Sequence, residues 1–204
     1  MTSQLPAGVV LNADQQRWDE RYLAGHGPPS HEILPWIAAQ QPYLQGGRAL
    51  DVACGVGRHS LWLAGLGYEV DAVDVSAVAL AKLAAAAAER SLGQHIRPLH
   101  ADLTRWRPQP ETYDLALVSL YLERSLLPAL REALKPGGLI LYTTFHTDLL
   151  RLQPDDNPAY LLQPGELLAT FPGWQILAYE DRRLPPDSQR RSDCTSSLLA
   201  RKGE

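Results

Sequence analysis

The residues best placed to do chemistry lie in a glycine-containing turn and in an acid that follows it. The segment Asp51–Arg58 reads DVACGVGR, and Gly55 and Gly57 in it leave room for a ligand to approach the backbone closely. Asp74 comes 19 residues after Gly55. A carboxylate at this point of the next structural unit can accept hydrogen bonds from both hydroxyls of a ribose. This spacing predicts a site for a ligand that carries an adenosine group.

The elements that must position this turn are short apolar runs alternating with helical stretches, a pattern typical of parallel strands joined by helical crossovers. Helices are expected at 58–66, from the N-cap Ser76 to 92, at 125–134 and at 164–171 with Pro164 in the first turn. The connection 180–193 is too short and polar for a crossover, which predicts an antiparallel last strand. The seven expected strands are 48–53, 69–75, 96–100 (an edge strand, because it holds Pro98), 113–119, 139–144, 175–179 and 196–200.

The fold class expected from this pattern is α/β: a doubly wound, mostly parallel, seven-stranded Rossmann-like sheet. A length of 204 residues suits one domain over 1–204. Within it we expect an N-terminal helical cover (1–45), a ligand-binding core (46–145) and a substrate-side loop, helix and hairpin (146–204). The stretch 12–41 is expected to pack across the sheet.

The chemistry of the turn discriminates between adenosine ligands. Dinucleotide sites prefer a third glycine where this chain has Ser60. Asp51 would also lie beside the two phosphates of a dinucleotide, where a negative charge is unfavourable. Beside an ammonium or sulfonium group the same carboxylate is favourable. The turn therefore favours S-adenosylmethionine over NAD.

Longer segments resemble a known family. LDVACGVGRHSLWLAGLGYEVDAVDVS resembles the first two motifs of class I S-adenosylmethionine-dependent methyltransferases, and ADLTRW, YDLALVS and LKPGGLILYTTF resemble the later motifs in the same order. WDERY, CGVGR and YLLQPGEL resemble the small tellurite-resistance methyltransferases and their thiopurine-methyltransferase relatives. A histidine expected in the last loop of that group is missing here. The resemblance spans about residues 16–202.

This resemblance implies which residues bind S-adenosylmethionine and its product, S-adenosylhomocysteine. Asp51, Gly55 and Gly57 would hold the methionine moiety, Asp74 the ribose, and Asp102 the adenine amine. The full set of implied cofactor-binding residues is Trp18, Arg21, Asp51, Ala53, Gly55, Gly57, Arg58, Asp74, Val75, Ala101, Asp102, Leu103 and Ser119.

The methyl acceptor would be bound by segments that reach the same edge of the sheet. Methyl transfer by direct displacement needs proximity and alignment more than acid–base help, so no catalytic residue is assigned. The Asn/Asp-Pro-Pro-Tyr motif of enzymes that methylate amides and nucleobase amines is absent after strand 113–119. We expect a small-molecule acceptor, with a chalcogen oxyanion or a thiol favoured. The substrate-side candidates are Tyr22, His146, Arg182, Arg183 and Arg190.

Composition limits the partners. The formal net charge is −4, which argues against nucleic acid. No signal peptide, membrane span or metal-ligand spacing is recognisable, which predicts a cytoplasmic protein without a metal. The sequence does not specify the oligomeric state. Two other functions stay open: a catalytically silent S-adenosylmethionine-binding or sensor protein, and an NAD-dependent oxidoreductase. No tyrosine lies four residues before any of the three lysines, as a Tyr-x-x-x-Lys pair would require.

Overall fold

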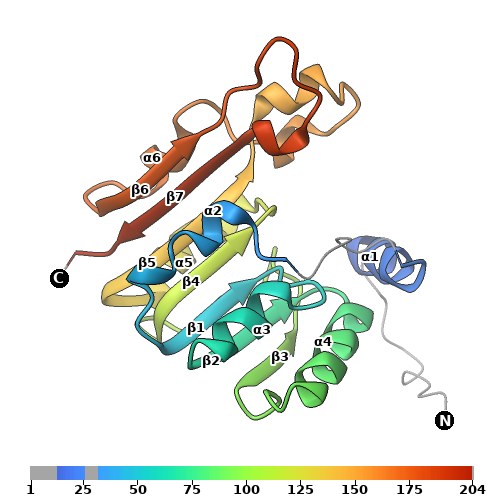
Figure 1. Cartoon of the computed structure of the whole chain (residues 1–204), viewed down its shortest axis with the longest axis vertical. Coiled ribbons are helices and arrows are strands. Elements are labelled where there is room, and N and C mark those ends of the chain that lie inside the picture. The colour runs from blue at the N-terminus through green and yellow to red at the C-terminus, as the bar shows by residue number, and fades with distance from the viewer. Residues whose placement is uncertain (1–12, 26–31, 204) are drawn as a thin grey trace.

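A twisted sheet of seven strands runs through the molecule (Figure 1). The computed structural model describes residues 13–25 and 32–203. The strand order is β3-β2-β1-β4-β5-β7-β6, and β7 alone runs against its neighbours. The predicted fold class is confirmed, as is the edge position of β3. The strands are β1 (Gly47–Val52), β2 (Tyr68–Asp74), β3 (Ile96–His100), β4 (Tyr113–Ser119), β5 (Leu134–Phe145), β6 (Gln175–Asp181) and β7 (Thr195–Arg201).

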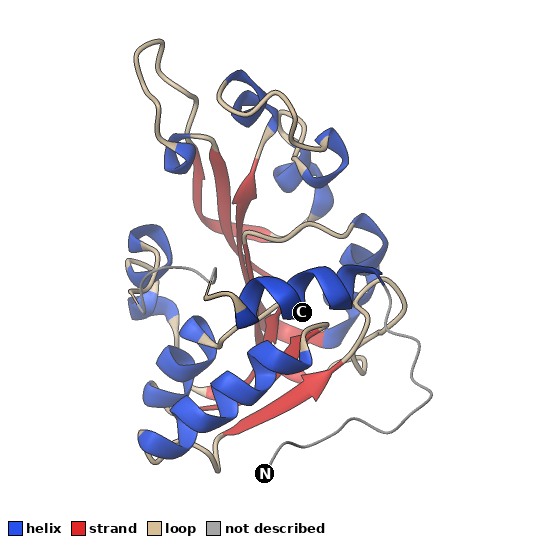
Figure 2. Cartoon of the chain, turned by 90° about the vertical axis from the view of Figure 1, so that its right-hand side faces the viewer, coloured by secondary structure: helices blue, strands red, loops and turns tan. Residues whose placement is uncertain are grey.

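Helices lie on both faces of this sheet (Figures 1 and 2). One face packs against α2 (Pro35–Ala38), α3 (Arg58–Gly65) and α4 (Ala77–Glu89). The other packs against α5 (Leu127–Ala133) and α6 (Glu166–Thr170). α1 (Ala13–Leu23) lies at the carboxyl ends of the first strands, beside α4 (Figure 1). The 3₁₀ turns are η1 (Gln41–Tyr43), η2 (Arg124–Leu126), η3 (Thr147–Arg151), η4 (Pro158–Tyr160) and η5 (Arg191–Asp193).

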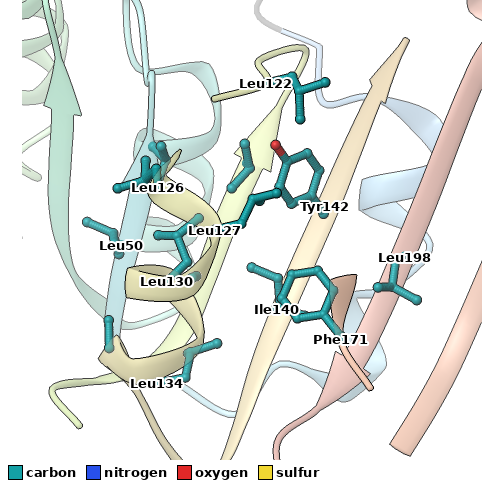
Figure 3. Packing of buried hydrophobic residues seen from close by; sticks show 14 of the residues in the cluster. Leu50, Leu122, Leu126, Leu127, Leu130, Leu134, Ile140, Tyr142, Phe171 and Leu198 are labelled. Atoms are coloured by element: carbon teal, nitrogen blue, oxygen red, sulfur yellow. The ribbon is translucent and has the colours of Figure 1, made fainter. Parts of the chain in front are cut away.

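The core on the α5 side is built from leucines spaced at helical intervals. Leu126 and Leu130 are both 1% exposed, and they pack with Leu50 and Ile140 of the sheet (Figure 3). Burying each such side chain contributes about 1.5–3 kcal/mol. These contacts fix the end of β4 relative to the end of β1. The glycine turn directly follows the end of β1.

Several element bounds differ from the sequence prediction by two or more residues, among them the end of α4 at Glu89 and the end of β6 at Asp181. β5 begins at Leu134, not at 139, and includes Pro136-Gly137-Gly138. The Gly137 N–H donates to the carbonyl of Lys202 and the Lys202 N–H donates to Gly138, so this stretch pairs with the chain beyond β7. α6 begins at Glu166 because Gly165 has a left-handed φ of 74°, and this excludes Pro164 from the helix.

The N-terminal stretch follows the prediction only in part. Ile37 of α2 is fully buried against the sheet face that carries α3. α1 instead packs on α4 and not across the sheet. Residues 1–12 and 26–31 lie outside the described part of the chain. In the part that is described, no helix is long and apolar enough to cross a membrane.

Candidate functional site

The glycine turn lies where the winding of the sheet reverses. β1 is followed by α3 on one face, and its neighbour β4 is followed by α5 on the other. Such switch points are where open α/β sheets bind ligands. Each strand is followed by a residue with left-handed backbone: Ala53 has φ 53° and Leu120 has φ 56°. Left-handed backbone at residues other than glycine is uncommon and tends to occur at functional sites.

Asp51 is the most deeply placed polar group of the turn. Its side chain is 1% exposed and accepts a 2.6 Å hydrogen bond from the Ser60 hydroxyl. The pKa of Asp51 is raised to about 7, mainly by burial and also by the nearby Asp74, against the opposing effects of Ser60 and Arg58. Ser60 therefore uses the position of the third glycine of a dinucleotide turn to hold this carboxyl group. The site favours a cation here, since a positive charge would stabilise the ionised form.

Asp74 ends β2 and organises the turn. One carboxylate oxygen accepts from the Gly55 N–H and the other from the Ser76 N–H, both at 2.8 Å. Burial raises the pKa of Asp74, and the two backbone donors oppose this rise. Each carboxylate oxygen can accept more than one hydrogen bond, so the group retains capacity for the hydroxyls of a ribose. The structure thus brings Asp51 and Asp74 to one turn, as the spacing predicted.

The two glycines of the turn are enclosed for different reasons. A methyl group added to Gly57 would lie 2.0 Å from a Leu83 methyl carbon, so this glycine is required for α3 to pack on α4. A methyl group added to Gly55 would lie 2.6 Å from the Tyr22 hydroxyl oxygen. The space over Gly55 therefore belongs to Tyr22 in this arrangement.

Three buried polar atoms at or beside the turn make no hydrogen bond to a described residue: the Ser119 hydroxyl, the Arg58 Nε and the His59 Nε2. Unpaired buried polar groups are costly, and they are often completed by a ligand. Together with the carboxyl groups of Asp51 and Asp74, they fit a ligand with ammonium, carboxylate and ribose groups. The residues present therefore suit S-adenosylmethionine.

The remaining predicted cofactor residues from β2 and β3 lie around Asp74. The Ala101 N–H donates to the Asp74 carbonyl at 3.0 Å, and the Val75 carbonyl accepts from His100 at 2.9 Å. Asp102 is half-buried and accepts from the backbone and hydroxyl of Thr104. Leu103 is buried in the core, so its backbone alone is available to a ligand.

The predicted residues of α1 form an aromatic stack. The rings of Trp18 and Tyr22 lie 5.9 Å apart, and the Arg21 guanidinium lies 5.4 Å from the centre of the Trp18 ring. Tyr22 is 8% exposed, whereas Arg21 is exposed. Of the three, Tyr22 is the residue that reaches the glycine turn.

His146, the histidine predicted at the end of β5, has both ring nitrogens bonded to backbone groups. His146 is 1% exposed; its Nε2 lies 2.7 Å from the Arg182 carbonyl oxygen, and its Nδ1 accepts from the Asp148 N–H. The Nε2 contact holds the loop after β5 against the loop after β6, and the Nδ1 contact stays within the loop after β5. In this arrangement His146 has no nitrogen left to act on a substrate.

The predicted arginines lie in the connection between β6 and β7, at the end of the molecule beyond β5 (Figure 1). Arg182 pairs with Glu180 at 2.8 Å and Arg183 with Asp181 at 2.7 Å. Arg190 makes no ion pair with a described residue. The charges of the first two are thus already balanced by neighbouring carboxylates.

Arg124 fastens the segment after β4 to the C-terminal part of the chain. Its guanidinium makes two hydrogen bonds to Glu166 and donates to the carbonyls of Ala159 and Leu161. Bidentate charged hydrogen bonds are the strong ones. This contact sets the position of the α6 segment relative to the end of β4.

We expect Arg124→Ala to lower the free energy of unfolding by about 1–2 kcal/mol, since charged hydrogen bonds are lost and the paired Glu166 is left alone. Denaturant unfolding measures this. Arg131→Ala on α5 is the control, because Arg131 makes no ion pair with a described residue. Equal losses in both variants would contradict the role assigned to Arg124.

Sequence reasoning missed two residues that shape the site. Asp19 of α1 accepts from the Ser76 hydroxyl at 2.6 Å, and the Lys82 ammonium donates to the Tyr22 carbonyl. Lys82 could have been singled out from the sequence, because it is the one charged side chain before Glu89 in an apolar helix. Asp19 had none, since its partner lies 57 residues away.

The strand order, with β7 antiparallel to its neighbours, is that of a Rossmann-like α/β fold. Residues 49–138 match the family described as "Methyltransferase domain". The ubiquinone biosynthesis O-methyltransferase of Burkholderia orbicola is 32% identical over 130 residues, which cover 59% of this chain. The chain spans 55% of the length of that relative.

Two solved structures have the same fold. An S-adenosylmethionine-dependent methyltransferase from Mesorhizobium loti superimposes with a TM-score of 0.66 at 23% identity, over 85% of this chain and 99% of its own. TehB from Haemophilus influenzae gives a TM-score of 0.68 at 20% identity, over 91% and 67% of the two chains. The narrower tellurite-resistance or thiopurine subgroup stays a prediction.

Proposed function

We propose that this chain is an S-adenosylmethionine-dependent methyltransferase that transfers a methyl group directly to a small-molecule acceptor. The observation that carries the proposal is the pair of buried carboxyl groups, Asp51 and Asp74, on one glycine turn at the switch point. The family match over the same residues and the named relatives support it. Ser60 in place of the third glycine speaks against an NAD-dependent oxidoreductase.

The bound cofactor would supply a methyl group on a positively charged sulfur. Asp51 would balance the charge of the methionine end, and Asp74 would fix the ribose. Ser119 would lie at the methyl end, with its free hydroxyl available for orientation. Transfer of that methyl group to the acceptor would remove the positive charge from the cofactor, so the residues present need only hold and align the two molecules. The protein's contribution is alignment and exclusion of water.

We further propose a soft, readily ionised acceptor, with a thiol ahead of a chalcogen oxyanion. A thiol needs little help from a general base, and His146 has both ring nitrogens engaged. The ion pairs of Arg182 and Arg183 reduce the attraction for a small oxyanion. The name of the relatives favours a second candidate, an oxygen acceptor such as a hydroxyl group, by analogy with their O-methylation. We propose that the protein acts without a metal and is cytoplasmic.

Release of S-adenosylhomocysteine in the presence of candidate acceptors tests this function. We expect turnover with small thiols and less or none with small hydroxyl compounds, tellurite or selenite. Preferential turnover with hydroxyl compounds would assign the acceptor to the second candidate. Tight cofactor binding with no turnover on any of these acceptors would favour a silent binding protein.

A further inference from the structure

The side chain of Tyr22, on α1, closes the space over Gly55 in the glycine turn. Tyr22 is 8% exposed, and its hydroxyl lies where a side chain on Gly55 would begin. This hydroxyl makes no hydrogen bond to a described residue. The two carboxyl groups below it, Asp51 and Asp74, are 1% and 6% exposed. A ligand that approaches the backbone at Gly55 must displace the Tyr22 hydroxyl from this position.

Two contacts outside the turn hold Tyr22 there. At one, the Asp19 carboxylate accepts from the Ser76 hydroxyl at 2.6 Å and from the Val78 N–H at 3.2 Å. These donors lie at the first turn of α4, where a negative charge is favourable. At the other, Lys82 donates from the second turn of α4 to the carbonyl of Tyr22 itself. We call this pair of contacts the α1–α4 clamp.

The clamp meets the residues that would bind the cofactor at one point, because Ser76 donates its hydroxyl to Asp19 and its N–H to Asp74. Ser76 keeps its capping bond to the Ala79 N–H at 3.0 Å, so α4 has its N-cap without Asp19. Lys82 lies on the α1 side of α4, while Leu83 and Leu80 bury the opposite side in the core. Removing the clamp therefore loosens α1 while leaving the sheet and the glycine turn in place.

We propose that Asp19 and Lys82 are positioning residues that keep Tyr22 over Gly55 and so limit the rate at which the cofactor enters. The inference rests on the proposed function. Opening the clamp requires only a few hydrogen bonds to break, which is a modest cost. The proposal predicts that weakening either contact of the clamp increases the fraction of molecules in which the turn is open. Association of the cofactor should become faster by the same factor.

The test is the association rate constant of S-adenosylmethionine, measured by stopped-flow fluorescence on the full chain. Asp19→Ala and Lys82→Met should each associate about fivefold faster, as loss of one or two ordinary hydrogen bonds implies. Asp19→Asn keeps an oxygen that accepts both bonds and should stay near the wild type. Gln16→Ala is the matched control on α1, because among the described residues Gln16 bonds only to the exposed Glu20.

Hydrogen exchange of the α1 amides, without added cofactor, gives a readout that does not depend on catalysis. It should accelerate in Asp19→Ala and Lys82→Met and not in Gln16→Ala. Association rates within twofold of the wild type, or slower, in both clamp variants would overturn the proposal. If the wild-type protein itself does not bind S-adenosylmethionine, the proposed function fails and not the clamp.

Discussion

Asp74→Ala should weaken the binding of S-adenosylmethionine by at least about 100-fold. A carboxylate that accepts from both ribose hydroxyls makes two charged hydrogen bonds, and each is worth about 1.5–3 kcal/mol. The same carboxylate also holds the Gly55 and Ser76 amides, so the turn loosens when it is removed. Calorimetric titration of the variant measures the change.

A control variant must separate the loss of cofactor binding from a general loss of stability. Asp71→Ala is the matched control, because Asp71 lies on the same strand and is 3% exposed but pairs with Arg48, Arg97 and Tyr113 away from the turn. It should lower stability and leave the cofactor affinity within about twofold, as expected of a site with no shared partner. Unchanged affinity in Asp74→Ala would show that the cofactor assignment is wrong.

The second large effect is a dependence of cofactor binding on pH. Burial raises the pKa of Asp51 to about 7, so the carboxyl group is mostly neutral at pH 6 and mostly ionised at pH 8. A cationic ligand favours the ionised form, so binding should release a proton. The affinity should rise about tenfold between pH 6 and pH 8 and level off above.

The stability of the folded protein depends on pH in the opposite direction. The pKa of Asp51 in the folded protein lies above its ordinary value of 3.8, so its contribution to stability is complete below pH 4 and is lost as the pH rises to 7. Asp51→Asn keeps an acceptor for Ser60 and should remove both dependences. Titrations in buffers of different ionisation enthalpy measure the proton release. A pH-independent affinity in the native protein would contradict the placement of a cation beside Asp51.

Much of the fold followed from local patterns. Apolar runs of strand length, glycines that stop helices and the short polar connection before β7 are local signals, and they predicted all seven strands and the direction of β7. The errors arose where partners distant in sequence decide. The Pro136-Gly137-Gly138 segment extends β5 because it meets Lys202, and a pattern limited to neighbouring residues cannot contain that contact.

The site divides in the same way. Asp51, Gly55 and Asp74 were predictable because strand ends on one sheet edge must converge. The hydrogen bonding of His146 could not be predicted, because the Arg182 carbonyl that it contacts lies in a loop 36 residues later. The closing of the turn by Tyr22 was also hidden, because it depends on the contacts of Asp19 and Lys82 with another helix.

The measurement that tests the central claim most directly is calorimetric titration of the purified protein with S-adenosylmethionine, with NADH titrated in parallel. The account predicts micromolar binding of S-adenosylmethionine and no binding of NADH at the same concentrations. Binding of NADH alone would contradict the assignment of Asp51 and Asp74 to a sulfonium cofactor. Binding of neither would contradict the proposed function and leave the fold alone established.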